Sequence, residues 1–291
     1  MLALIPRAPG RYLWGMTVIR AATLGACRGV QRALAIVDRT LAEHPGEAVY
    51  TLGPLIHNPR VVEEYRRRGA VPVASLSDVE RGIVVIRAHG IGPDERRFCG
   101  RQGVTCVDAT CPDVLRVQEL VRDHAARGIG VVIVGDPSHV EVRGIRGYAP
   151  DSVVVSTESE AEAIALPGPC IAVGQTTFPR DRYLRIAEIL RRRIPGLEVH
   201  ETSCPATERR QQSLVELARK VEAIVVVGGR ESANTRWLHQ VAVATGKPAW
   251  HVEGADELPP DIGRFRTVGI SAGASTPEII IAEVEAALAS R

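Results

Sequence analysis

The sequence predicts an α/β fold in which three similar units surround one shared site. Three cysteines, Cys27, Cys111 and Cys204, each follow a short apolar stretch and precede an amphipathic one. Two further strand-to-helix units come after each cysteine, which gives nine such steps in three sets. Strands that alternate with helices favour parallel sheets with right-handed crossovers, so we expect mainly parallel sheets.

Length and composition limit the possible classes of protein. The chain has 291 residues, of which 45% are hydrophobic, and this is long for one simple domain. We expect an N-terminal extension over 1–16 and three repeats over 17–110, 111–203 and 204–291. The 36 basic and 34 acidic residues are interspersed, which argues against a nucleic-acid partner. The apolar runs are far shorter than the roughly 20 residues of a membrane span, and no export signal is evident, so we expect a cytoplasmic protein.

The first unit of each set is a strand, a cysteine and a helix. The helices are expected over 28–41, 112–124 and 205–221. Apolar residues recur there at three- and four-residue spacing, as at Val30, Ala33 and Val37. A proline directly follows the second and third cysteines and suits the first turn of a helix.

Polar residues replace the cysteine in the second and third units. Second strands over 48–52, 130–135 and 223–229 lead to His57-Asn58, to His139 and to Ser232-Ala-Asn234. Third strands over 83–87, 170–174 and 267–270 lead to His89-Gly90, to Gln175-Thr-Thr177 and to Ser271-Ala-Gly-Ala-Ser275. The second-unit polar residue lies at nearly the same distance beyond the cysteine in each set. Such a constant register indicates a true repeat.

A pseudo-threefold arrangement of these units would create one central cavity, because parallel sheets place binding groups beyond the carboxyl ends of their strands. Three thiolates that converge there could hold an iron–sulfur cubane by three of its irons and leave the fourth iron open. An open iron can accept a substrate oxygen while the cluster passes electrons one at a time. This chemistry suits the reductive removal of a hydroxyl group.

The other polar groups of the cavity suit a small anionic substrate. Many are hydrogen-bond donors and few are negatively charged, as expected for binding a diphosphate. The candidate substrate-binding residues are His57, His89, His139, Thr177, Ser232, Asn234 and Ser275. Glu141 and Thr176 fall at equivalent strand ends, and a carboxylic acid with a hydroxyl could relay protons.

Two other functions remain open on the residues alone. A protein that is not an enzyme could use an iron–sulfur cluster, or zinc held by three cysteines and nearby histidines, to sense redox state or to bind a partner. A non-redox dehydratase would use an open iron only as a Lewis acid. The remaining cysteines, Cys99, Cys106 and Cys170, have no counterparts in the other sets, and we expect them to be core-packing residues.

In this order the motifs resemble one known family, the 4-hydroxy-3-methylbut-2-enyl diphosphate reductases of the non-mevalonate isoprenoid pathway (the LytB/IspH family). The likeness runs from about Thr17 to the C-terminus. The matching stretches are Cys27-Arg-Gly-Val, His57-Asn58, Ala88-His-Gly90, Asp108-Ala-Thr-Cys-Pro112, His139-Val-Glu-Val142, Gln175-Thr-Thr177, Cys204-Pro-Ala-Thr207, Ser232-Ala-Asn234 and Ser271-Ala-Gly-Ala-Ser275.

The resemblance implies a trefoil of three α/β domains around a [4Fe–4S] cluster on Cys27, Cys111 and Cys204, with one open iron. It implies that the substrate is a small allylic diphosphate whose hydroxyl binds that iron. Glu141 with Thr176 would supply protons, and ferredoxin or flavodoxin would supply electrons. The products would be isopentenyl and dimethylallyl diphosphates.

Several positions depart from the pattern of that family. Arg28 stands where a small residue is usual, Ala26 replaces an aromatic residue, and Val140 replaces a proline. Ala233 replaces a serine that usually helps to hold diphosphate, and Arg209 replaces an asparagine. A paralogous [4Fe–4S] reductase or a dehydratase that acts on a related substrate is therefore the alternative.

Overall fold

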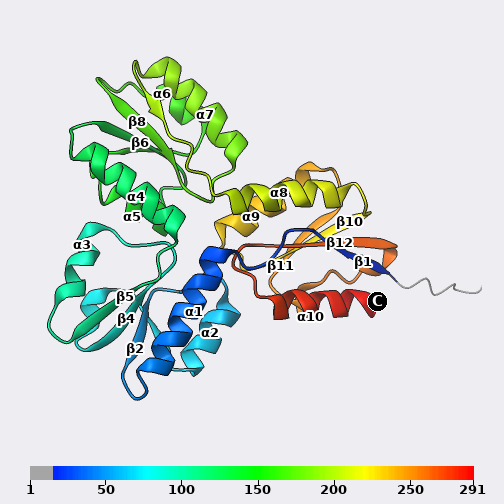
Figure 1. Cartoon of the computed structure of the whole chain (residues 1–291). Coiled ribbons are helices and arrows are strands. Elements are labelled where there is room, and N and C mark those ends of the chain that lie inside the picture. Colours follow the sequence, from blue (N-terminus) through cyan, green and yellow to red (C-terminus); the bar gives the residue numbers. More distant parts are fainter. Residues whose placement is uncertain (1–15) are drawn as a thin grey trace, which may run out of the picture.

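The computed structural model describes residues 16–291, which form three lobes around a common centre (Figure 1). Each lobe contains one four-stranded sheet, and all strand pairs are parallel. The predicted α/β class with three related units is confirmed. Of the extension expected over 1–16, only Met16 lies within the described residues. In this part of the chain no helix has the length and apolar character of a membrane span.

The first lobe has the strand order β3-β2-β4-β5. Its elements are α1 (Arg28–Glu43), β2 (Val49–Leu52), α2 (Pro59–Arg67), β3 (Ala70–Val73), β4 (Gly82–Ile86), α3 (Pro93–Arg96) and β5 (Val104–Asp108), with short 3-10 helices at Leu76–Asp78 and Arg97–Gly100. One face of the sheet packs against α1 and α2 through Ala33, Val37 and Val61. The other face buries Leu76 and Ile91 instead of a long helix.

The second lobe repeats this order as β7-β6-β8-β9. Its elements are α4 (Pro112–Ala125), β6 (Gly130–Val134), α5 (Val140–Arg146), β7 (Val153–Val155), α6 (Glu158–Ala163), β8 (Cys170–Gly174), α7 (Arg180–Arg193) and β9 (Glu198–Val199). Helices cover both faces, because Val117 and Val121 of α4 pack on one face and Ile186 and Leu190 of α7 pack on the other.

The third lobe is closed by the beginning of the chain. Its elements are α8 (Pro205–Ala218), β10 (Ala223–Val227), α9 (Ala233–Ala244), β11 (Ala249–Val252), 3-10 helices at Ala255–Glu257 and Ile262–Arg264, β12 (Thr267–Ala272) and α10 (Glu278–Ala289). The fourth strand is β1 (Thr17–Arg20), whose Thr17 pairs with Thr267 of β12. Residues 17–20 were assigned to the repeat over 17–110, but in the structure they complete the third sheet in the order β1-β12-β10-β11.

The chain passes from one lobe to the next at each predicted cysteine. Cys27 follows β1 of the third lobe, and the helix after it, α1, packs on the first lobe. In the same way α4 begins after Cys111 and packs on the second lobe, and α8 begins after Cys204 and packs on the third. The three cysteines therefore lie at the three junctions between lobes, near the centre of the molecule.

Each sheet also contains a strand that was not predicted from the sequence. These strands are β3, β7 and β11, and each lies at the edge of its sheet. They pair only with β2, β6 and β10, respectively. They are three or four residues long and, unlike the predicted strands, they do not lead to a cysteine or to a candidate polar residue of the site.

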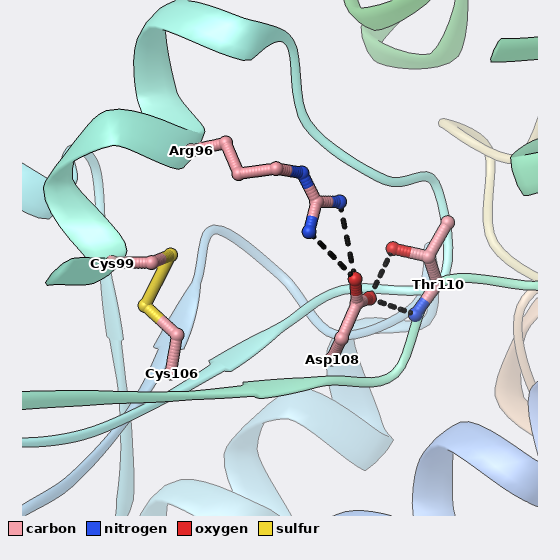
Figure 2. The surroundings of a disulfide bond; sticks show 5 residues. All are labelled: Arg96, Cys99, Cys106, Asp108 and Thr110. Carbon is pink, nitrogen blue, oxygen red and sulfur yellow. Dashed lines mark hydrogen bonds and ion pairs between the residues drawn. A yellow bond between two sulfur atoms is a disulfide. The ribbon is translucent and has the colours of Figure 1, made fainter. Parts of the chain in front are cut away.

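The first lobe differs from the others in the helical segment that follows its third strand. This segment has 14 residues in α7 and 12 in α10, but only four in α3, with a 3-10 turn after it. A disulfide between Cys99 and Cys106 ties that turn to β5 (Figure 2). Both cysteines were expected only to pack, and the bond corrects this expectation. Pairing depends on how closely two Cα atoms approach, here 5.3 Å, and the seven-residue spacing does not show it.

Candidate active site

Three cysteine side chains meet at the centre of the trefoil and line one cavity. The backbone N–H of each cysteine donates to a carbonyl in the loop after the third strand of the preceding sheet. These bonds run from Cys27 to Ala274 (3.0 Å), from Cys111 to Ala88 (2.9 Å) and from Cys204 to Thr176 (2.9 Å). The next residues in the accepting loops are Ser275, His89 and Thr177. In each lobe a backbone hydrogen bond therefore places one cysteine next to one predicted substrate-binding residue.

Gly29 shows how closely two of the sulfur atoms approach the same point. A Cβ atom at this position would lie 2.8 Å from Sγ of Cys111 and 3.7 Å from Sγ of Cys27. Any side chain at position 29 would therefore displace a thiol. The third thiol, Cys204, lies with its Sγ 3.1 Å from a carboxylate oxygen of Asp113.

The protonation of these thiols depends on burial. Burial raises the pKa of Cys111, and burial together with the Asp113 carboxylate raises the pKa of Cys204 to about 12. Thiolates here therefore need a positive partner. Each cysteine directly precedes the first turn of a helix, and helix N-termini favour negative charge. The buried guanidinium of Arg210 lies close by and donates to the carbonyl of Gly25.

These three thiols fit an iron–sulfur cluster that has three protein ligands, and not one in which four cysteines hold all of the irons. Three thiols line the cavity, whereas Cys170 is buried in the core of the second lobe and Cys99 is bonded to Cys106. Thus no fourth cysteine of the described residues lines the cavity. A metal that replaces the thiol protons would remove the penalty indicated by the raised pKa values. The cavity can therefore supply three ligands and leaves room for a further group beside them.

Three histidines lie together beside the cysteines. The ring centroids of His57 and His89 are 4.5 Å apart, and that of His139 lies 5.6 and 5.5 Å from them. His139 caps α5, and its Nδ1 accepts the backbone N–H of Glu141 at 3.2 Å. Because Nδ1 is an acceptor, the ring proton of neutral His139 is on Nε2. His139 thus has a free N–H group.

Burial keeps these histidines neutral. It lowers the pKa of His57, with Arg87 as the next cause, and lowers the pKa of His139 to about 4. The pKa of His89 is lowered well below its usual value by burial and by the two neighbouring rings. An anion bound among them would reverse these effects, since it favours the protonated form of each ring.

The third lobe faces the histidines with hydroxyl and amide groups. Ser232 caps α9 and lies with its Oγ 3.4 Å from Oγ of Ser275, and both residues are buried. Nδ2 of Asn234, Nε2 of His57 and Nδ1 of His89 are buried and have no hydrogen-bond partner in the described chain. Buried polar groups without partners are costly, so their convergence on one cavity indicates a polar ligand.

Glu141 and Thr176 form a closed hydrogen-bonded pair at the same cavity. The backbone N–H of Thr176 donates to Oε1 of Glu141 at 2.6 Å, and its hydroxyl lies 3.0 Å from Oε2. Burial raises the pKa of Glu141 to about 7. Because Oε1 already accepts an N–H, a proton on this acid resides on Oε2, next to the hydroxyl of Thr176.

All of the predicted site residues line this cavity. Three charged neighbours were not predicted from the sequence: Arg87, which is half-buried beside the histidines, Asp113 and Arg210. The only signal for Arg87 was a single charge between the apolar stretch at 83–86 and His89. Arg210 lies among other charged residues of α8, and the sequence does not distinguish it from them.

A second cavity opens on the same three cysteines from another direction. It shares the thiols with the first cavity, but its other walls come from the 22–31 segment, from Asp113 at the start of α4 and from the start of α8. Arg28 and Arg209 are exposed there, and among residues 16–291 neither guanidinium forms an ion pair or a hydrogen bond. The cysteines therefore separate a buried polar cavity from a positively charged opening.

Comparisons with known proteins show one family over nearly the whole chain. The model of the LytB protein family matches residues 18–289. A 4-hydroxy-3-methylbut-2-enyl diphosphate reductase from Solidesulfovibrio magneticus is 42% identical, with 94% of this chain and all of the relative covered. One from Treponema denticola is 40% identical over 93% of this chain and 98% of the relative.

Two solved structures are also similar. One is the structure of (E)-4-hydroxy-3-methyl-but-2-enyl diphosphate reductase, the terminal enzyme of the non-mevalonate pathway. It is 34% identical, has a TM-score of 0.70, and the match covers 95% of this chain and all of that one. The other is the E-1-hydroxy-2-methyl-but-2-enyl-4-diphosphate reductase from Plasmodium falciparum, with 27% identity, a TM-score of 0.87 and coverage of 94% and 86%.

Proposed function

The chain belongs to the LytB protein family, and on this basis we propose that it reduces 4-hydroxy-3-methylbut-2-enyl diphosphate. The products are isopentenyl and dimethylallyl diphosphates. The observation that carries the proposal is the convergence of three thiols, unpartnered polar groups and a protonatable glutamate on one cavity. We further propose that Cys27, Cys111 and Cys204 hold a [4Fe–4S] cluster with one open iron. A cytoplasmic location stays a prediction.

The reaction removes a hydroxyl group and adds hydrogen to the remaining carbon skeleton. The carbon–oxygen bond breaks, two electrons and two protons enter, and water leaves. When bound, the cluster supplies the electrons and a Lewis acid for the hydroxyl oxygen. The protein must hold the diphosphate, exclude water and deliver the protons.

Substrate binding falls to the groups that lack partners. Nε2 of His57, Nδ1 of His89 and the amide of Asn234 are available for phosphate oxygens, with the hydroxyls of Ser232 and Ser275 beside them. These side chains are neutral when the cavity is empty, so they do not repel one another before binding. Ala233, where the family usually has a serine, forms part of this wall but provides no hydroxyl.

Proton delivery falls to Glu141 and Thr176. A carboxylic acid with a pKa of about 7 is half protonated at neutral pH, which suits a general acid. Its Oε2 proton can pass to the hydroxyl of Thr176, which lines the cavity. The first proton leaves with the substrate oxygen as water, and the second is added to carbon.

Electrons enter from the second cavity in this proposal. Arg28 and Arg209 bring two positive charges without ion-pair partners in residues 16–291 to its opening, which favours an acidic electron-transfer protein. Ferredoxin or flavodoxin is the proposed donor. The same two arginines depart from the usual family pattern, so we attribute them to donor docking and not to a change of substrate.

Anaerobic turnover tests this function. Iron and sulfide are first restored to the purified protein, and dithionite with a viologen then replaces the natural donor. We expect a brown protein that consumes two electrons per substrate molecule and makes both products. A colourless, iron-free protein after reconstitution would refute the cluster. Turnover that persists without a reductant would instead identify a dehydratase.

A further inference from the structure

A second group of potential metal ligands lies in the second lobe, outside the central site. It consists of His124 in the last turn of α4, Glu198 in β9 and His200 just after that strand. One ligand atom from each residue lies within 4.8 Å of the others. Since α4 has 14 residues and begins after Cys111, this group is about 20 Å along the helix from that cysteine.

Strand alternation brings two of these side chains to the same face. Glu198 and His200 are two residues apart on the edge strand of the sheet, so both side chains point to one side. Val199 between them packs on the opposite face, in the core formed with α7. The face of Glu198 and His200 is covered by α4, which ends next to them at His124. The backbone therefore holds the three residues together.

The ring of His124 has a defined tautomer. Its Nδ1 lies 2.8 Å from the backbone carbonyl oxygen of Leu120, which can only accept a hydrogen bond. Nδ1 therefore carries the proton of the neutral ring, and Nε2 keeps a free lone pair. Histidines that bind metals commonly donate their second ring nitrogen to a carbonyl in this way. His124 is thus prepared to act as a ligand through Nε2.

The ring of His200 has no such hydrogen bond. Its Nε2 is shielded from solvent and has no hydrogen-bond partner, although Oε1 of Glu198 lies 3.0 Å away. The rings of His124 and His200 have centroids 5.5 Å apart. The His200 backbone is fixed on both sides, since its N–H donates to Ala172 and its carbonyl accepts the hydroxyl of Tyr183. An orphaned ring nitrogen therefore lies between a carboxylate and a second imidazole.

We propose that His124, Glu198 and His200 bind a divalent transition metal, with zinc as the best match. Two imidazoles and one carboxylate are a donor set that zinc accepts, with water at the fourth position. Zinc bonds of about 2.0–2.1 Å require the ligand atoms to close to about 3.3 Å from one another. Glu198 is an exposed side chain and can make this movement.

The bound ion would join two elements that lead to the central site. The helix α4 begins directly after Cys111, and β9 leads to Cys204 four residues beyond His200. A metal that holds α4 to β9 therefore stabilises the folded second lobe and the relative positions of these two cysteines. The site is structural and does not depend on the proposed reaction.

Zinc titration of the cluster-loaded protein tests this site, because iron then occupies the central cysteines. Under anaerobic conditions, calorimetry with zinc chloride should show one equivalent bound per chain, and the melting temperature should rise. His200→Ala should weaken zinc binding by at least about a hundredfold. Cobalt should give visible absorption bands in the wild-type protein that His200→Ala removes.

Matched variants separate this site from adventitious binding. His44 forms an exposed pair with Glu47, with its Nδ1 2.9 Å from Oε1 and no second histidine in the cluster, so His44→Ala should leave zinc binding unchanged. If His200→Ala does not fold, His124→Gln and a change at the exposed Glu198, Glu198→Gln, should each weaken binding. The proposal is overturned if the wild type binds no stoichiometric zinc, or if none of these three ligand variants weakens binding.

Discussion

The two cavities that meet at the three cysteines differ in burial and in charge. On one side, His139, Glu141 and Ser275 are all less than a tenth exposed, and the histidines are held neutral. On the other side, Arg28 and Arg209 are exposed and form no ion pair within residues 16–291. The buried side is thus lined by groups whose pKa values are altered, and the exposed side is lined by arginines that have no ion-pair partner.

This difference indicates a division of labour across the cysteines. Neutral, desolvated groups bind an anion without mutual repulsion and can transfer protons at neutral pH. Exposed cations attract a charged protein partner over a distance without excluding water. In the proposed function, substrate and protons therefore use the buried side, and electrons use the positively charged side. Substitutions on each side can test this division separately.

The largest effect is expected for Glu141→Gln. The amide can still accept the N–H of Thr176 but cannot donate an acidic proton, so viologen-driven turnover should fall by about 100- to 10,000-fold. The absorption spectrum of the cluster should not change. Wild-type activity should decline as pH rises above about 7, where Glu141 loses its proton. Near-normal activity of the variant would remove this residue from proton delivery.

A smaller effect is expected at the positively charged opening. Changing Arg28 and Arg209 together to glutamate should lower kcat/KM for reduced ferredoxin about tenfold, and more salt should lower the wild-type value toward that of the variant. Activity with dithionite and a viologen should stay within about twofold, because the buried side is unchanged. Arg39→Glu, an exposed change on α1, is the matched control. An equal loss with both donors would show that the arginines act on the cluster and not on docking.

Substrate binding should also take up protons. The pKa values of His57, His89 and His139 lie below the usual value, so these rings are neutral at pH 7, and a bound diphosphate raises them. The anion raises the pKa of Glu141 as well, so both effects have the same sign. Calorimetry at pH 7 in buffers with different ionisation enthalpies should show net uptake. Proton release on binding would contradict the assignment of this cavity to the diphosphate.

The smallest effect on activity is expected for the disulfide, which lines neither cavity. Arg96 beside it pairs with Asp108, which in turn accepts from the backbone and hydroxyl of Thr110, the residue before Cys111 (Figure 2). Replacing Cys99 and Cys106 with serine should lower the free energy of unfolding by about 2–3 kcal/mol through loop entropy. Denaturant unfolding measures this loss, with the wild type under reducing conditions as a comparison. A large loss of activity in a well-folded variant would instead link the bond to Cys111.

The site could be predicted from the sequence largely because it repeats. The cysteines recur before three helices, and the equivalent strand ends of the three sets place His89, Thr177 and Ser275 at the same site. The sequence could not predict that β1 completes the third sheet. The residue pattern of a strand and its following helix does not show which sheet the strand joins. Long-range contacts were also hidden: His124 and His200 are far apart in the sequence, and only the packing of α4 beside β9 brings them together.

Mössbauer spectroscopy combined with iron analysis is the decisive measurement for a three-cysteine cluster with an open iron. Protein reconstituted anaerobically with ⁵⁷Fe should contain four irons per chain, and one of them should differ from the three held by Cys27, Cys111 and Cys204. Addition of substrate should change the signal of that one iron and leave the other three nearly constant. Zinc in place of iron, or four equivalent irons that do not respond to substrate, would contradict this assignment of the cysteines.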